Sequence, residues 1–295
     1  MTEKTLIANG LHLAYDEFGC ADHPVMLLVM GLGTQMIGWP EPFCESLAAK
    51  GYRVIRFDNR DIGLSEKIDA ELPNLFKLVM MDKLGLPIKA PYTLYDMAQD
   101  TVGLLDALDI RQAHLVGASM GAMICQIVAG KYPQRALSLS SIMSTSGAKS
   151  LPGASARVTW HMLTRPKAQN EQAIVEHGMR TWQLIGSLAY PPEPSVLAER
   201  ILRGIRRSYH PPGYVRQAAA ILASGDRVNL LKSLALPTLV IHGKADLLVP
   251  VACGIDTARH VSGARLELIE GMGHDLPVEL YSRVINLISE TASAA

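Results

Sequence analysis

The segment HLVGASMGA, residues 114–122, constrains this chain most, because it places a serine between two glycines. Apolar residues before it predict a strand, and the apolar run 120–131 predicts a helix. A sharp turn at such a junction holds Ser119 in a strained conformation and lifts its hydroxyl clear of the sheet. Gly117 and Gly121 leave room for neighbouring backbone. The pattern predicts a nucleophilic serine; the alternative is that Ser119 only caps the helix.

Strand-like and helix-like segments alternate through most of the chain. Short apolar runs bounded by turn residues predict strands, and apolar residues at helical spacing predict helices between them. This alternation is typical of an α/β fold with a doubly wound, mostly parallel sheet. The predicted strands are 11–18, 25–30, 52–57, 113–116, 136–143, 238–242 and 265–270. The predicted helices are 41–50, a short one within 66–92, 95–108, 120–131 and 277–288.

Residues 147–236 differ from the rest of the chain, because they contain helix-like segments and no convincing strand. We predict a core formed by 1–146 and 237–295, with 147–236 inserted as a helical cap. Residues 148–230 hold eleven Lys and Arg against five Asp and Glu, whereas the whole chain has 28 of each class. One hypothesis from this excess is that the cap favours anionic substrates or an acidic lipid surface.

A serine nucleophile needs a base, and the base needs a group that orients it. Among nine histidines, His274 stands out, because it lies in the glycine-rich turn GMGHD after the last predicted strand. Asp246 follows the preceding strand in HGKADLLVP, whereas Asp275 is adjacent to His274 and cannot comfortably bond its ring. Loops at the carboxyl ends of parallel strands form the sites of such sheets. We therefore expect the catalytic residues Ser119, Asp246 and His274, in the chain order of one hydrolase class.

The motifs GASMGA, HGKADLLVP and GMGHDLP, at these spacings, resemble those of the α/β-hydrolase superfamily. The segments MGLGTQMIGW and RFDNRDIGLS are similar to a bacterial branch of small serine esterases around aclacinomycin methylesterase. The resemblance covers nearly the whole chain and is fainter across the insertion. It implies an eight-stranded sheet with a helical cap after the sixth strand. It also implies an oxyanion hole formed by the backbone N–H groups of Leu32 and Met120.

The chain departs from the family pattern at two positions. Met30 stands where many relatives have the histidine of a His-Gly pair, so the hydrogen bonding of the oxyanion loop is expected to differ. The role of Leu32 is unaffected, because its donor is backbone. Asp61 stands where many relatives have glycine in R-G-x-G-x-S. We expect that segment to be structural, with Asp58 and Arg60 supporting the oxyanion loop.

These features predict acyl transfer to water through an acyl-serine, and hence a carboxylic ester hydrolase. A serine at the turn excludes the alkyl-ester chemistry of relatives that carry aspartate there. A thioesterase, a lactonase, a methyl esterase or a perhydrolase of the same fold remains open. An alternative of another class is a hydrolase-fold binding protein with little turnover.

Large side chains of the insertion are candidates for lining a pocket over Ser119, and packing within the cap is the alternative for each. They are Trp160, Met162, Met179, Trp182, Tyr190, Tyr209 and Tyr214. The clustered arginines Arg200, Arg203, Arg206 and Arg207 are expected to form a solvated helix face rather than to bind substrate.

Composition and charge exclude several other classes. The net charge of zero lacks the basic excess of a nucleic-acid binder. The chain has no H-x-x-x-H, cysteine cluster or carboxylate triad, so neither a metal nor another cofactor is expected. A dinucleotide site at Gly31 and Gly33, with Asp58 as ribose ligand, is disfavoured because Met36 occupies the third glycine position.

The remaining expectations concern location and partners. Four widely spaced cysteines, Cys20, Cys44, Cys125 and Cys253, predict reduced thiols rather than disulfides. No signal peptide or membrane-spanning segment is expected, because the first residues and the mid-chain apolar stretch both contain too many polar positions. We expect a cytoplasmic enzyme acting on a small-molecule ester; the sequence does not indicate its oligomeric state.

Overall fold

The structure is a computed structural model that describes residues 3–164, 166, 168 and 170–295. Eight strands form one sheet in the order β1-β2-β4-β3-β5-β6-β7-β8. The pairs β1–β2 and β2–β4 are antiparallel, and all other pairs are parallel. This sheet confirms the predicted fold class. The strands are β1 Lys4–Ala8, β2 Leu11–Phe18, β3 Val25–Val29, β4 Arg53–Phe57, β5 Ala113–Ala118, β6 Ala136–Ile142, β7 Thr238–Gly243 and β8 Arg265–Ile269.

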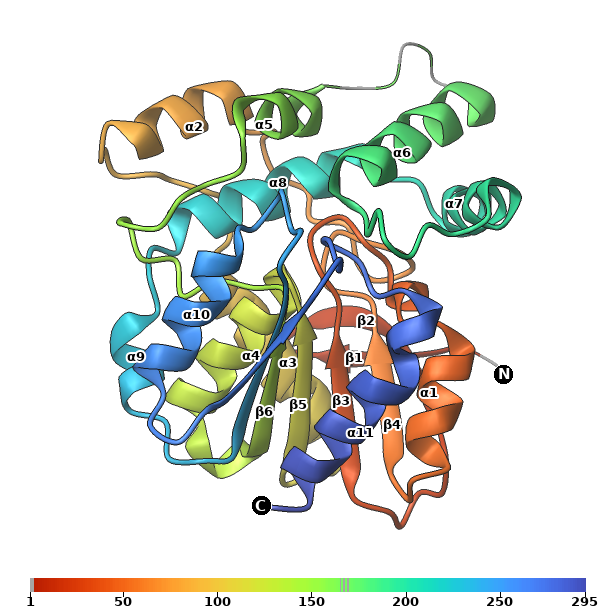
Figure 1. The fold of residues 1–295 in the computed structure, drawn as a ribbon, viewed down its shortest axis with the longest axis vertical. Coiled ribbons are helices and arrows are strands. Elements are labelled where there is room, and N and C mark those ends of the chain that lie inside the picture. The colour runs from red at the N-terminus through yellow and green to blue at the C-terminus, as the bar shows by residue number, and fades with distance from the viewer. Residues whose placement is uncertain (1–2, 165, 167, 169) are drawn as a thin grey trace.

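Helices cover both faces of the sheet (Figure 1). Helices α1 (Glu41–Ala48) and α11 (Tyr281–Ala292) pack on one face. The other face carries α3 (Leu94–Ala107), α4 (Met120–Lys131), α9 (Val228–Lys232) and α10 (Val251–His260). Each interface contains its own buried apolar cluster, so the sheet lies between two hydrophobic cores. Single 3-10 turns occur at Met36–Gly38, Pro133–Arg135 and Val278–Leu280.

Five further helices lie above the carboxyl ends of the parallel strands (Figure 1). They are α2 (Leu75–Lys83), α5 (Ala156–Leu163), α6 (Glu171–Ile185), α7 (Pro194–Arg207) and α8 (Pro211–Ala223). Helix α8 runs across the top of the sheet. The name cap is used below for 156–223, which holds α5 to α8 between β6 and β7. Helix α9 falls inside the range predicted for the insertion, but it packs against α4 and α10 beside the sheet.

The principal difference from the predicted elements is strand β1, which the sequence pattern did not indicate. Its five residues are mostly exposed, and it lies at the edge of the sheet beside β2. A short edge strand buries too little apolar surface to leave a periodic signal. Local sequence signals are stronger elsewhere: Thr93 and Asp96, three residues apart, form a capping box at the start of α3.

Candidate active site

Ser119 lies in the turn between β5 and α4, with φ 55° and ψ −120°. A non-glycine residue in this region is strained, which fits the conformation expected of a nucleophile at such a turn. A Cβ atom at Gly121 would lie 2.0 Å from the Val29 carbonyl oxygen, and one at Gly117 would lie 2.4 Å from the Ala122 nitrogen. Glycine is therefore required on both sides of the serine, because neighbouring backbone occupies the space of a side chain.

The structure brings the three residues expected to be catalytic into one hydrogen-bonded series. His274 Nε2 lies 3.0 Å from Ser119 Oγ, and His274 Nδ1 lies 2.7 Å from Asp246 Oδ2. A carboxylate can only accept, so Nδ1 carries the proton and Nε2 is left to accept from the serine hydroxyl. The imidazole is therefore in the tautomer that a general base for Ser119 requires.

Asp246 is buried and extensively hydrogen-bonded, which keeps its carboxylate charged. Oδ1 accepts from the backbone N–H groups of Leu248 and Val249, at 2.9 and 2.8 Å. Burial pushes the pKa of Asp246 upward, but the positive charge that His274 carries when protonated and hydrogen bonds from His242, His274 and Val249 outweigh it and lower the pKa to about 2. A permanently charged carboxylate can stabilise the imidazolium that forms when His274 takes a proton.

The loop that contains Leu32 lies directly beside the serine. A Cβ atom at Gly31 would be 3.2 Å from the Ser119 Cβ atom and 3.7 Å from its Oγ. Within the part of the chain that the structure describes, no group accepts a hydrogen bond from the backbone N–H of Leu32 or of Met120. Met120 is also the first residue of α4, where the positive end of the helix dipole lies. Both N–H groups are therefore available to an oxyanion formed next to Ser119.

Three side chains hold the loop around Leu32. Asn59 Nδ2 donates to the Met30 carbonyl oxygen at 2.9 Å, and Asp58 Oδ1 accepts from the Met36 N–H at 2.7 Å. Gln217, on α8 of the cap, accepts from the Gly33 N–H at 2.9 Å. The support expected from Asp58 is therefore present.

The support expected from the Arg60 side chain is not present. Its guanidinium forms a buried ion pair with Asp100 of α3, with Nη2 2.6 Å from Asp100 Oδ1. A buried carboxylate needs a cationic partner, and Arg60 is the one that faces Asp100. Only the Arg60 carbonyl oxygen is linked to the loop, through Gln217.

The turn that carries His274 is held by the cap. The His274 N–H donates to the Ile185 carbonyl oxygen at 2.7 Å, and the Gly273 N–H donates to Ser187 Oγ at 2.8 Å. The Ser187 hydroxyl in turn donates to Asp275, and burial raises the pKa of that carboxyl group. Asp275 thus bonds the cap rather than the His274 ring, which agrees with the expectation that it is not the orienting acid.

Three residues of this site were not anticipated from the sequence: His242, Ser187 and Gln217. His242 is fully buried in β7, and its Nε2 lies 2.8 Å from the Val249 carbonyl oxygen and 3.5 Å from Asp246 Oδ2. Ser187 and Gln217 lie in no motif, because the groups they bond are more than 80 residues away in the chain. Only the folded structure reveals such contacts.

The pocket residues predicted in the cap differ in how they lie. Trp160 is 68% exposed and stands two residues from buried Val158, on the opposite side of α5. Tyr209 is 45% exposed. The prediction that Trp160 lines a pocket over Ser119 is therefore wrong, because its side of the helix faces solvent, and the exposure of Tyr209 also argues against a lining role.

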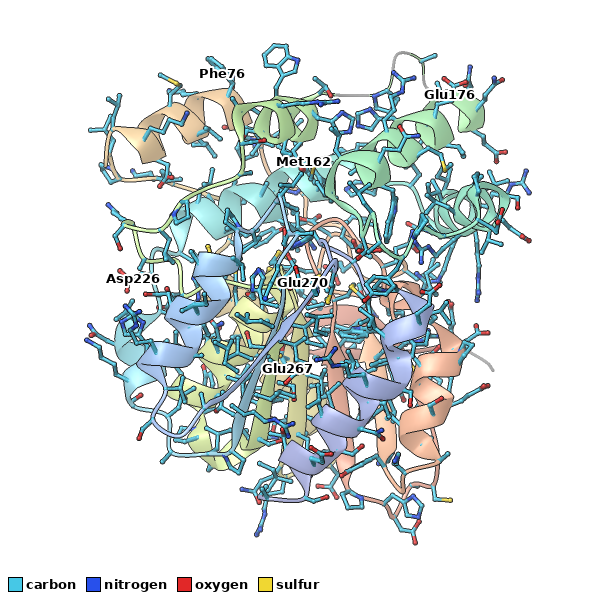
Figure 2. The ribbon with its side chains drawn as sticks, in the orientation of Figure 1. Phe76, Met162, Glu176, Asp226, Glu267 and Glu270 are labelled. Carbon is cyan, nitrogen blue, oxygen red and sulfur yellow. The ribbon has the colours of Figure 1, made fainter. Side chains whose placement is uncertain are left out.

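The other candidates are partly buried inside the cap or beneath it. Figure 2 shows Met162 below α5, towards the sheet, whereas Phe76 projects from the outer side of α2. Trp182 stacks against Arg200, with its ring centroid 4.3 Å from the guanidinium carbon, so it packs between α6 and α7. Tyr214 lies over the oxyanion loop, because a Cβ at Gly33 would be 2.6 Å from its ring. The half-buried candidates are Met162, Met179, Trp182, Tyr190 and Tyr214.

The positive excess of the cap meets the negative excess of the core at their interface. Arg203 pairs with Glu41 at 2.7 Å, Arg207 with Asp58 at 2.8 Å, and Arg216 with Asp61 at 2.7 Å. These pairs account for cap arginines without an external anion. Because these three pairs neutralise half of the excess of six positive charges in 148–230, the hypothesis that the excess selects anionic substrates or a lipid surface loses that part of its basis. The arginines expected to form a solvated helix face are Arg200, Arg203, Arg206 and Arg207. That expectation is wrong for Arg207, because its side chain is only 10% exposed.

Two other groups of residues could suggest a binding site, one for a dinucleotide and one for a metal ion. The loop at Gly31 and Gly33 is followed by the 3-10 turn Met36–Gly38 instead of a helix, which does not suit a dinucleotide phosphate. Cys20, Asp22 and His23 offer ligand atoms within 4.8 Å of one another among the described residues. They lie on the loop before β3, at the end of the sheet opposite Ser119, so they have no part in its chemistry.

Two further observations concern the helices and the cysteines. None of the helices that the structure describes is both long enough and apolar enough to cross a bilayer. All four cysteines are free thiols, with Cys20 exposed and Cys44, Cys125 and Cys253 buried.

Comparisons with known proteins match the chain to hydrolases. A family model described as the alpha/beta hydrolase fold matches residues 24–279. Rhodomycin D methylesterase DauP from Streptomyces sp. strain C5 is 28% identical over 93% of this chain and 92% of its own. The 3-oxoadipate enol-lactonase 2 of Acinetobacter baylyi is 27% identical over 91% of this chain and 88% of its own.

Solved structures share the architecture. The enol-lactonase from Burkholderia xenovorans LB400 has a TM-score of 0.76 with 21% sequence identity, covering 98% of this chain and 100% of that one. Together, these matches confirm the resemblance seen in the motifs, and the relatives named here are a methylesterase and two enol-lactonases. The chain belongs to the α/β-hydrolase family.

Proposed function

We propose that the protein hydrolyses carboxylic esters of small to medium acyl or alkyl groups through an acyl-enzyme on Ser119. The observation that carries this proposal is the series from Asp246 through His274 to Ser119, with hydrogen-bond distances of 2.7 and 3.0 Å. The strained turn at Ser119 and the two available N–H groups beside it support the same reaction.

In acylation, Ser119 Oγ bonds to the ester carbonyl carbon while its proton passes to His274 Nε2. The carbonyl π electrons move onto the oxygen, where the N–H groups of Leu32 and Met120 stabilise the negative charge. The C–O bond to the alcohol then breaks, and the alcohol leaves with the proton held by His274. In deacylation, water gives a proton to His274 and attacks the acyl carbon; Ser119 leaves, takes that proton back, and the acid is released.

Methyl esters and enol-lactones are the first substrates to test, because the relatives are named for them. Both are cleaved at the acyl C–O bond by the same steps, and in a lactone the released alcohol stays attached to the acid. A thioester would acylate Ser119 in the same way, and hydrogen peroxide in place of water would give a peracid. We also propose a cytoplasmic location, supported by the four free thiols.

A fluorophosphonate probe and p-nitrophenyl esters of several chain lengths test the proposal. We expect rapid labelling and turnover by the native protein, and loss of both by at least about 10⁴-fold in Ser119→Ala. The melting temperature should remain nearly unchanged, as it should in the control Ser233→Ala at an exposed surface site. Normal hydrolysis by Ser119→Ala would disprove the assignment. Labelling without turnover of any ester, lactone or thioester would instead favour a hydrolase-fold binding protein.

A further inference from the structure

We propose that Gln217, on α8 of the cap, is a positioning residue that sets the orientation of the oxyanion donor at Leu32. The inference rests on the proposed function, because it concerns the same reaction. Gln217 is fully buried, and its amide makes two hydrogen bonds to the core. Oε1 accepts from the Gly33 N–H at 2.9 Å, and Nε2 donates to the Arg60 carbonyl oxygen at 2.8 Å.

The peptide group between Leu32 and Gly33 is hydrogen-bonded at both ends. Its N–H is held by Gln217, and its carbonyl oxygen accepts from the Thr34 hydroxyl at 3.2 Å. A peptide group is planar, so holding both of its ends fixes the backbone rotation on the carboxyl side of Leu32. The preceding peptide group, which carries the Leu32 N–H, is held at its other end, because the Gly31 carbonyl oxygen accepts from the Thr34 N–H at 3.2 Å.

Helix α8 covers this loop closely. Gly33 has φ +66°, and a Cβ there would lie 2.6 Å from the Tyr214 ring. Tyr214 and Gln217 are three residues apart on α8, so they lie on the same side of the helix. The ring occupies the space above Gly33 while the amide binds its N–H. A glycine that could otherwise adopt many conformations is thereby held in one.

Met30 stands at the position where many relatives carry a histidine. In this chain, the Met30 side chain offers no comparable hydrogen-bond donor. The loop instead receives polar contacts from Asn59, from Asp58 and from the cap residue Gln217. Asn59 and Gln217 bind the two peptide groups that flank the one carrying the Leu32 N–H, and of these two side chains Gln217 is the one that comes from the cap. We infer that the hydrogen bonding expected to differ at this loop has moved to the cap.

The role predicts a specific kinetic signature. Because Gln217 acts through the Leu32 N–H, its loss should weaken binding of the tetrahedral oxyanion and leave binding of the uncharged ground state nearly unchanged. A misplacement of about 1 Å can cost about 10²-fold in rate. A purely structural role would instead lower stability without separating the two states.

Two ketones of equal length separate these states: 1,1,1-trifluorooctan-2-one and octan-2-one. Ser119 Oγ adds to the carbonyl carbon of the first, its proton passes to His274, and the π electrons form an oxyanion; the second binds without addition. In Gln217→Met, which keeps the volume but removes both hydrogen bonds, we expect kcat to fall and the inhibition constant of the trifluoro ketone to rise by about 10- to 100-fold. KM and the constant for octan-2-one should change less than about twofold.

Gln217→Asn, which shortens the amide by one methylene, should show the same separation and carries the test if the methionine variant does not fold. Ser224→Ala is the matched control, because Ser224 Oγ also accepts from a core backbone N–H, that of Leu94, at 2.8 Å. It should lower the melting temperature and leave the ratio of the two constants unchanged.

Several outcomes would overturn the proposal: a folded Gln217 variant that keeps the native ratio, equal weakening of both ketones, or failure of both variants to fold. The proposed function fails separately, if the native protein neither forms the trifluoro ketone adduct nor labels at Ser119.

Discussion

Arg216 of the cap and Asp61 of the core form a two-point ion pair, with Nε 2.9 Å from Oδ2 and Nη2 2.7 Å from Oδ1. Asp61 is fully buried and has φ 72°, and its carboxylate also accepts from the Tyr92 hydroxyl and the Ile68 N–H. Burial pushes the pKa of Asp61 upward, but these bonds outweigh it and hold the pKa below its ordinary value. A residue that departs from the family's glycine thus anchors α8, the helix that also carries Gln217.

Replacing Asp61 with glycine tests this anchor. Glycine suits the positive φ, so the backbone gains from the change, but the buried guanidinium of Arg216 is left without its carboxylate. We expect Asp61→Gly to lower the free energy of unfolding by about 3 kcal/mol. Urea unfolding of this variant, of Arg216→Met and of the double variant gives the coupling. The double variant should recover most of the loss, and simple addition of the two losses would show that the pair is not coupled.

Two other ion pairs between cap and core, Arg203 with Glu41 and Arg207 with Asp58, should differ in strength because they differ in burial. The side chains of Arg203 and Glu41 are 60% and 44% exposed, whereas those of Arg207 and Asp58 are 10% and 0% exposed. Arg203→Met should therefore cost less than about 1 kcal/mol of unfolding free energy, and the loss should shrink further in salt. Arg207→Met should cost about 3 kcal/mol, because it leaves the Asp58 carboxylate buried and unpaired. Equal losses in urea unfolding at low salt would contradict this comparison.

The residues that could be predicted share one property: their signals lie in a short stretch of sequence. Ser119 is marked by glycines two residues away on each side, and Asp246 and His274 are marked by turns that directly follow predicted strands. Parallel strands bring their carboxyl ends to one edge, so three local patterns were enough to predict that these side chains meet. The structure indeed brings them into hydrogen-bond contact.

The cap could not be predicted to the same depth. Its helices carry apolar residues on several sides, and nothing local distinguishes Trp160, which faces solvent, from Met162, which lies beneath α5 (Figure 2). The groups that link the cap to the site act over long separations in the chain: Gln217 reaches Gly33, and Ser187 reaches Gly273. Such contacts depend on how α6 and α8 are docked on the sheet, and one sequence carries no pattern for that.

The turn at Ser119 should tolerate no side chain at Gly121. The added Cβ would lie 2.0 Å from the Val29 carbonyl oxygen, and backbone on both sides prevents relaxation. We expect Gly121→Ala to lower the free energy of unfolding by more than about 3 kcal/mol or to prevent folding. Gly153→Ala is the control, because a Cβ there meets nothing within 4 Å. Thermal melting of both variants provides the measurement, and a normal melt for Gly121→Ala would show that the turn is not as close as described.

Asp246 should contribute stability that depends on pH in a defined direction. Its pKa is about 2 in the folded protein against an ordinary value of 3.8, so the charged form is favoured by folding. The stabilisation is fully present above pH 3.8 and is lost as the pH falls through 2, for a total of about 2 kcal/mol. The side chain is 0% exposed, so solvent screening is small.

In urea unfolding, the advantage of the native protein over Asp246→Asn should shrink by about 1 kcal/mol between pH 6 and pH 3. The control Ser233→Ala, which alters no titratable group at an exposed site, should show no such shrinkage. An advantage that stays constant or grows as the pH falls would mean that the Asp246 carboxylate is not stabilised by its hydrogen bonds to His274 and the backbone.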